Sequence, residues 1–492
     1  MITRREALRG MGRATMTCGA PPALWTALTS CSSSPPEQVA APYQEADRTA
    51  WFREAKFGMF IHWGPYSVAG VEASWPIMKP EWFPHVKPIS EQDYVALPAK
   101  FNPVEFDPGA WVQLAREAGM RYMVITTKHH DGFCMFDAPG TDYKITNTPY
   151  GKDIVALLAS ACGEAKMPLG FYYSPPDMHH PGFRDTAKPA TANWNGEPSR
   201  AEWATYLDYM ETHLRKLLTS YGHVAVLWFD GLFGQQKYDP ERFHTLIRAM
   251  SPRTLINDRL GPGGDYVTPE QAVPEGVPVK RTEPRQEIPP EILDQLLTQS
   301  QALPAEKLAA MMKEYVKRQF PTKTRPTPEE FQLWETCMTI NSTWGFNPGD
   351  TSYKPAETLI RTLVEVASRG GNFLLNVGPS PLGVIPPESA ERLRSIGAWM
   401  ARNGQSIYGT GFGPIQGQPQ VRTTIRDGVT YVHVFDWPAD RLVVEGFSQK
   451  AGSITLLTGN QPVAYEQEDS RLTISRPAAA RDSAATVLAV RT

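Results

Sequence analysis

The chain has 492 residues, of which 41% are hydrophobic and 21% charged, as in an ordinary globular protein with a large core. The 49 basic and 52 acidic residues give a formal net charge of −3. This near balance excludes a disordered polyelectrolyte and argues against a protein built mainly to bind nucleic acid.

The first 30 residues are predicted to be an export signal. Arg4 and Arg5 form a twin-arginine start, and the apolar stretch that follows is too short and too polar to stay in a bilayer as a helix. Small residues then precede Cys31 in a pattern similar to a lipoprotein cleavage box, and a Ser/Pro-rich tether follows over residues 31–48. We therefore expect an exported protein, periplasmic or anchored to a membrane by a lipid on Cys31. An unmodified cysteine in a signal tail is the alternative.

Residues 49–404 alternate between short apolar runs and amphipathic helical patterns. The apolar runs predict strands at 56–62, 121–127, 168–174, 224–230, 254–258, 335–340 and 372–377. The helical patterns cover 107–118, 154–164, 203–220, 241–250, 356–368 and 388–403. Near-continuous apolar strands joined by helices indicate a parallel sheet with both faces covered. We therefore expect an α/β protein whose main domain is a (β/α)8-like TIM barrel.

Two further regions depart from this alternation. Residues 283–330 are polar and helix-forming, and we expect a helical insertion that either shapes the substrate entrance or only decorates the surface. Residues 405–492 hold short strand patterns separated by turn residues, which predict a small C-terminal antiparallel β-sandwich. It carries few His or clustered carboxylates, so we expect it to be structural or weakly sugar-binding.

Catalytic groups of a parallel barrel lie at the C-terminal ends of its strands, and here those ends are polar and aromatic. They read, in chain order, His62-Trp63, Lys128-His129-His130-Asp131, Tyr172-Tyr173-Ser174, Trp228-Phe229-Asp230, Asn257-Asp258-Arg259, Trp334-Glu335 and Asn376. His and Arg can bond several hydroxyls, Trp and Tyr offer flat apolar faces, and carboxylates can act as nucleophile and acid. The set predicts hydrolysis of a sugar bond.

Two other functions stay open at this point. A metal-dependent hydrolase could use His62, His129 and Asp230 as ligands. His129 and His130 are adjacent on a predicted strand and should point to opposite faces, which disfavours one ion bound by both. A non-catalytic glycan-binding lipoprotein is the third hypothesis, and the candidate carboxylates argue against it.

Three segments carry a family resemblance: FIHWGPYS at 60–67, KHHDGF at 128–133 and LWFDG at 227–231. They resemble the α-L-fucosidases of glycoside hydrolase family 29, and the resemblance runs from about residue 51 to residue 408. It implies a TIM-like barrel with a C-terminal β-sandwich and retaining, exo-acting hydrolysis. The implied partner is a fucosylated oligosaccharide or glycoconjugate, with no metal or other cofactor.

Position by position, the resemblance implies that Asp230 is the nucleophile. The residues that would hold the fucosyl unit are His62, His129, His130, Tyr172, Trp228 and Arg259, with Trp75 and Trp344 lining the pocket. Ser74 stands where the family often has a Glu before the pocket Trp. One hydroxyl contact is therefore expected to differ.

The acid/base is the least determined residue, because its position varies within the family. Glu270 lies on a predicted long loop, forty residues after the nucleophile, and Glu335 lies in an apolar strand. Asp265 is a third candidate. We favour Glu270, because a loop carboxylate can reach the leaving oxygen. A Glu within an apolar strand is more often a buried residue that orients its neighbours.

Overall fold

The computed structural model divides the chain into two units, Met1–Pro42 and Tyr43–Thr492. It describes residues 45–80, 87–194, 196, 198–231, 238–281, 320–438, 440–478 and 482–492. The predicted signal, Cys31 and most of the tether lie outside the described residues. No helix within these ranges is long and apolar enough to cross a membrane.

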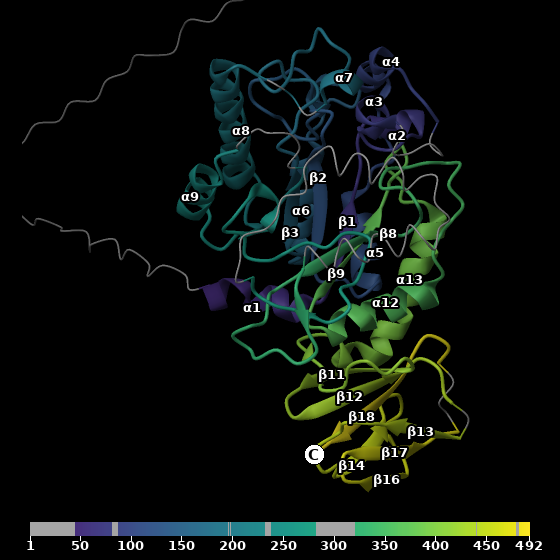
Figure 1. Ribbon diagram of the computed structural model, residues 1–492. Coiled ribbons are helices and arrows are strands. Elements are labelled where there is room, and N and C mark those ends of the chain that lie inside the picture. Colours follow the sequence, from purple (N-terminus) through teal and green to yellow (C-terminus); the bar gives the residue numbers. More distant parts are fainter. Residues whose placement is uncertain are drawn as a thin grey trace, which may run out of the picture. The chain divides into compact units, whose positions relative to one another are not determined.

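Seven parallel strands form the main sheet of the second unit (Figure 1). They are β1 (Phe57–Ile61), β2 (Met123–Lys128), β3 (Leu169–Tyr173), β4 (Val224–Phe229), β5 (Leu255–Ile256), β8 (Glu335–Thr339) and β9 (Asn372–Val377). Their order in the sheet is β5-β4-β3-β2-β1-β9-β8. Every residue in them is buried, as a sheet covered on both faces requires. The predicted parallel sheet is confirmed.

The segment 266–271 closes the sheet between its two outer strands. Tyr266 forms a parallel bridge with Asn257, which follows β5, and Glu270 forms one with Cys337 of β8. With the seven regular strands, this irregular segment makes eight, and it is the sixth in chain order. The (β/α)8-like prediction is confirmed. Glu270, expected on a long loop, instead forms a β-bridge with Cys337 near the end of this irregular segment.

Helix α1 precedes the first barrel strand, α13 follows the last, and the other helices lie in the connections between strands (Figure 1). They are α1 (Glu45–Ala55), α2 (Tyr66–Ala69), α3 (Trp75–Met78), α4 (Glu91–Val95), α5 (Pro108–Glu117), α6 (Ile154–Ala165), α7 (Ala190–Asn193), α8 (Arg200–Ser220), α9 (Pro240–Met250), α12 (Ala356–Ser368) and α13 (Pro387–Asn403). Capping residues determine where several of these helices begin. Asp107 caps α5 by accepting the Ala110 N–H at 3.0 Å, and Ser199 caps α8 in a capping box with Glu202.

A short antiparallel pair flanks the predicted insertion. β6 (Val277–Pro278) pairs with β7 (Thr322–Lys323), so the chain leaves and re-enters the barrel at one place. Residues 320–330 form β7 and turns rather than helix. The rest of the insertion, residues 283–319, lies outside the described residues.

The C-terminal strands form two antiparallel sheets (Figure 1). One holds, in order, β10 (Gly411–Phe412), β11 (Val421–Arg426), β12 (Val429–Val434), β18 (Thr486–Arg491), β14 (Ser453–Leu456) and β15 (Gln461–Pro462). The other holds β13 (Arg441–Val444), β17 (Arg471–Ser475) and β16 (Tyr465–Glu468). Val432 and Leu488 of the first sheet share one core with Leu442 and Ile474 of the second. The predicted β-sandwich is confirmed.

Candidate functional site

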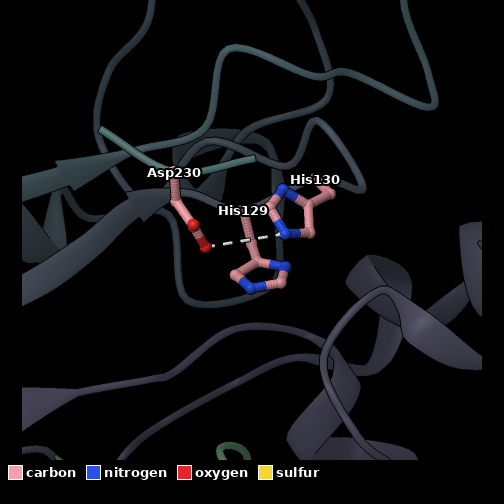
Figure 2. Close-up of side chains that lie close together, drawn as sticks. All are labelled: His129, His130 and Asp230. Carbon is pink, nitrogen blue, oxygen red and sulfur yellow. Dashed lines mark ion pairs between the residues drawn. The ribbon is translucent and has the colours of Figure 1, made fainter. Parts of the chain in front are cut away.

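Three histidines lie directly after the C-terminal ends of two barrel strands. His62 follows β1, and His129 and His130 follow β2. The ring centroids of His129 and His130 are 4.2 Å apart, and those of His62 and His129 are 5.6 Å apart. The prediction that His129 and His130 point to opposite faces is wrong, because β2 ends at Lys128 and strand alternation ends with it. Figure 2 shows both rings beside Asp230.

All three imidazoles are buried and fixed through Nδ1. The pairs within hydrogen-bond distance are His62 Nδ1 with Asn376 Oδ1 at 2.7 Å, His129 Nδ1 with Ser74 Oγ at 2.6 Å, and His130 Nδ1 with Ser174 Oγ at 2.6 Å. Burial lowers the pKa of His62 to about 4 and the pKa values of the other two well below their usual range. The histidines are therefore neutral near pH 7 and act as hydrogen-bonding groups.

Asp230 follows the C-terminal end of β4 and faces the rings of His129 and His130 (Figure 2). Its Oδ2 accepts a hydrogen bond from the Tyr172 hydroxyl at 2.8 Å, and its Oδ1 accepts one from Arg259 Nη1 at 2.7 Å. The His130 Nε2 lies 3.7 Å from Oδ2. The side chain is 18% exposed, so it is oriented by two donors and still accessible to a ligand. These are the properties that a carboxylate nucleophile needs.

Arg259 joins Asp230 to a second carboxylate. Its Nη2 donates to Glu270 Oε2 at 2.8 Å, while its Nε donates to the Thr268 hydroxyl at 2.9 Å. The guanidinium lies over the Trp228 ring, 4.7 Å from the centroid. One cation therefore holds two carboxylates side by side at the mouth of the barrel.

Glu270 has the environment of a proton donor. Although 39% of its side chain is exposed, burial of the remainder raises its pKa. The Arg259 guanidinium opposes this rise, and the neighbouring Asp230 charge adds to it. A carboxyl group with a raised pKa beside an oriented carboxylate is the arrangement that separates a general acid from a nucleophile.

Glu335 occupies a different position, in the barrel interior. It is fully buried, and it accepts hydrogen bonds from the Trp228 indole N–H at 2.9 Å and from the Tyr122 hydroxyl. Burial raises its pKa to about 7. It therefore fixes Trp228 beneath Arg259. Asp265, the third candidate, accepts bonds from Arg48 and Arg248 and has a structural role.

We expect Glu335→Gln to change the pH dependence of folding. The pKa of Glu335 is raised from 4.5 to about 7, so the native state holds this proton more tightly than the unfolded chain. The resulting stability is fully present below pH 4.5 and is lost as the pH rises through 7. Relative to the variant, the wild type should lose on the order of 3 kcal/mol across this window, measured by urea unfolding. A pH-independent difference would contradict the assignment.

Aromatic side chains complete the pocket. Trp344 is partly buried, and its ring centroid lies 4.9 Å from that of His62. Trp75 is also partly buried and meets His130 edge-on at 5.4 Å. Tyr172 stacks on His129, with an angle of 5° between the ring planes. Trp228 is only 1% exposed, so it supports Arg259 and Tyr172 from below rather than forming an open wall.

Glu72 is a site residue that the sequence reasoning missed. Its fully buried carboxylate accepts the backbone N–H groups of Ala73, Trp344 and Gly345 at 3.0, 2.9 and 3.1 Å. It thereby fixes the loop that carries Trp344. Trp344 and Gly345 lie more than 270 residues further along the chain, so no local pattern could have identified these contacts. An acidic residue within the apolar run 71–78 was the available signal.

A group of potential metal ligands also lies here. Within the described ranges, His129, His130 and Asp230 each offer one ligand atom, and these atoms lie within 4.8 Å of one another. The set contains His130 where the metal hypothesis had His62. Arg259 donates to the same carboxylate, and its positive charge opposes binding of a cation.

Comparisons with known proteins agree on one family. The α-L-fucosidase family model matches residues 26–289 and 293–405. Isoenzyme 1 of the α-L-fucosidase from Paenibacillus thiaminolyticus is 31% identical, with a TM-score of 0.74 over 91% of this chain and 99% of that chain. A family 29 α-L-fucosidase from Bacteroides thetaiotaomicron, solved as a trapped covalent intermediate with 2-fluoro-fucosyl fluoride, is 25% identical. Its TM-score is 0.70, over 90% of this chain and 95% of that chain. The plasma α-L-fucosidase of Homo sapiens is 27% identical over 455 residues, which are 85% of this chain and 83% of the relative. The chain thus belongs to the α-L-fucosidase family, glycoside hydrolase family 29.

Proposed function

We propose that this protein is a retaining, exo-acting α-L-fucosidase that removes terminal α-L-fucosyl residues from glycans by double displacement. The observation that carries the proposal is the position of Asp230 and Glu270, which share one arginine at the mouth of the barrel. Retaining glycosidases need two carboxyl groups about 5–5.5 Å apart on either side of the scissile bond. The relative trapped as a covalent intermediate supports the same chemistry.

In the first step the Asp230 carboxylate attacks the anomeric carbon of the fucosyl unit. The bond to the leaving oxygen breaks, and Glu270 gives its proton to that oxygen. In the second step Glu270, now a carboxylate, removes a proton from a water molecule whose oxygen attacks the same carbon. The bond to Asp230 breaks, and both carboxyl groups return to their starting states. Two inversions give net retention.

The burial of the groups around Asp230 supports exo action. The three histidines, Trp228 and Glu335 are buried at the strand ends, so solvent and ligand do not pass beyond them. A pocket of this form admits the end of a glycan chain rather than its interior. The proposed partner is therefore a fucosylated oligosaccharide or glycoconjugate with a free terminal unit.

The experiment that tests the proposed function is hydrolysis of 4-nitrophenyl α-L-fucoside by the mature chain, with and without EDTA. Nuclear magnetic resonance identifies the anomer formed first. We expect α-L-fucose to be released first, at a rate that EDTA does not change. Absence of hydrolysis, first release of the β-anomer, or activity lost to EDTA and restored by zinc would contradict the proposal.

We also propose that the enzyme is exported and anchored by a lipid on Cys31, on the basis of the sequence pattern around this residue. Cys31→Ser is expected to abolish incorporation of labelled palmitate and to move the activity from the membrane fraction to the soluble fraction. Cys18→Ser, within the predicted signal, is the matched control and should change neither. Unchanged membrane association of Cys31→Ser would contradict lipidation.

A further inference from the structure

We propose that Ser74 and Ser174 are positioning residues that fix His129 and His130 in opposite tautomers. The two neighbouring rings then present one protonated and one unprotonated Nε2, a donor and an acceptor for a sugar hydroxyl. This inference rests on the proposed function, because it assigns the hydrogen-bonding pattern of the same pocket. It follows from the number of hydrogens that each hydroxyl can donate.

The tautomer of His130 is set by Ser174. The Ser174 hydroxyl donates to the Pro176 carbonyl oxygen at 2.8 Å. A serine hydroxyl has one hydrogen, so the same oxygen can only accept in its 2.6 Å contact with His130 Nδ1. Nδ1 therefore carries the ring proton. The neutral ring then presents an unprotonated Nε2, 3.7 Å from the Asp230 carboxylate.

The tautomer of His129 is set by Ser74 in the opposite sense. The Ser74 hydroxyl oxygen accepts the Asp131 backbone N–H at 2.8 Å. Its own hydrogen is then directed to His129 Nδ1 at 2.6 Å. In the other tautomer His129 would donate, and the hydrogen of this fully buried hydroxyl would lose its acceptor, which is unfavourable in the protein interior. Nδ1 therefore accepts, and Nε2 carries the proton.

The backbone of Ser74 supports a positioning role. Its φ of +43° lies in the left-handed region, which a residue with a side chain seldom occupies. Such strain persists where the surroundings hold it in place, and it is often found at functional sites. Here the Tyr94 hydroxyl accepts the Ser74 backbone N–H at 2.9 Å and so holds Ser74 against His129.

The third ring, His62, has the same tautomer as His130. The Asn376 amide donates to the Trp344 carbonyl oxygen at 2.8 Å, so its Oδ1 accepts from His62 Nδ1 at 2.7 Å. The Nε2 of His62, like that of His130, is then unprotonated. Of the three rings, His129 is the one that donates toward the pocket.

This pattern distinguishes a hydroxyl ligand from a cation. One nitrogen of each adjacent ring and one Asp230 oxygen lie within 4.8 Å of one another (Figure 2). A hydroxyl can accept from His129 and donate to His130 or Asp230. A metal ion needs a lone pair from every ligand, which the Nε2 of His129 offers only after the tautomer of that ring changes.

The test is long-range proton–nitrogen correlation spectroscopy on the mature chain labelled with ¹⁵N-histidine, with His129→Gln and His130→Gln spectra used for assignment. We expect the proton on Nε2 in His129 and on Nδ1 in His130. The same tautomer in both rings, or the reversed pattern, would overturn the inference. The wild-type spectrum decides this without substrate, so a failure of the proposed hydrolysis is distinguishable.

Variants of Ser174 test the role of this serine directly. Ser174→Ala should give His130 a mixture of tautomers and raise KM for an aryl α-L-fucoside about three- to tenfold with little change in kcat. Ser174→Thr, which keeps a hydroxyl, should restore both. Ser67→Ala is the matched control, because this buried hydroxyl donates to the Gly64 carbonyl oxygen instead. An Ala variant with wild-type tautomers and the KM of the control would overturn the role of Ser174.

Discussion

Asp230→Asn is expected to lower kcat/KM for an aryl α-L-fucoside by about 10⁴-fold or more, because the amide cannot form the covalent bond to the anomeric carbon. The fold should persist, since the amide keeps the shape of the side chain and can still accept from Arg259 or Tyr172. Steady-state kinetics and thermal unfolding measure the two effects separately.

Two further variants sharpen this test. Asp427→Asn is the matched control. This carboxylate is 84% exposed and belongs to the C-terminal β-sandwich, so the variant should retain wild-type activity. Asp230→Gly should regain fucosyl transfer when azide is added, because the small anion enters the space of the lost carboxylate. The product should be the β-linked fucosyl azide. More than a tenth of wild-type activity in Asp230→Asn would contradict the nucleophile assignment.

Glu270→Ala is expected to affect substrates according to their leaving group. Natural glycans leave as poorly stabilised alkoxides and need the proton, so their kcat/KM should fall about 10²–10⁴-fold. An aryl fucoside with a good leaving group should lose much less in the first step. Rates across a series of aryl fucosides of increasing leaving-group pKa measure this dependence, which should be steep for the variant and shallow for the wild type.

The pH profile gives a second measure of the same residue. Burial raises the pKa of Glu270 and keeps its proton available toward neutral pH. In the wild type kcat/KM should fall on the alkaline side, where this proton is lost. Glu270→Gln should lack that limb.

Glu335→Ala provides the comparison. Loss of the Glu335 carboxyl group leaves the Trp228 N–H and the Tyr122 hydroxyl without their buried acceptor. Activity should therefore fall equally for all leaving groups, and the free energy of unfolding should fall as well. A leaving-group dependence in Glu335→Ala that is absent in Glu270→Ala would reverse the assignment.

The regular strands could be predicted because their apolar runs are long and bounded by turn residues. The segment 266–271 could not be predicted as a strand. It pairs with its neighbours only through isolated β-bridges, and its sequence shows no alternation of apolar and polar residues. Glu270 was favoured because a loop residue could reach the leaving oxygen, but it lies in this segment of the barrel wall. Helix α1 begins at Glu45, inside the stretch predicted as a tether.

The polar strand ends correctly pointed to one site, because the carboxyl ends of parallel strands meet at one mouth. The orientation of the adjacent histidines could not be predicted, since it depends on where β2 ends. Contacts such as that of Glu72 with the loop carrying Trp344 join distant parts of the chain. They follow from the folded barrel rather than from any local pattern.

The most direct test of the account is covalent labelling with 2-fluoro-fucosyl fluoride, followed by peptide mass spectrometry. The electron-withdrawing fluorine slows the second displacement, so a retaining enzyme accumulates the fucosyl-enzyme. We predict one 2-fluoro-fucosyl group per chain, attached to Asp230 and absent from Asp230→Asn. Turnover of aryl fucosides without any labelled peptide, or a label on another carboxylate, would contradict double displacement through Asp230.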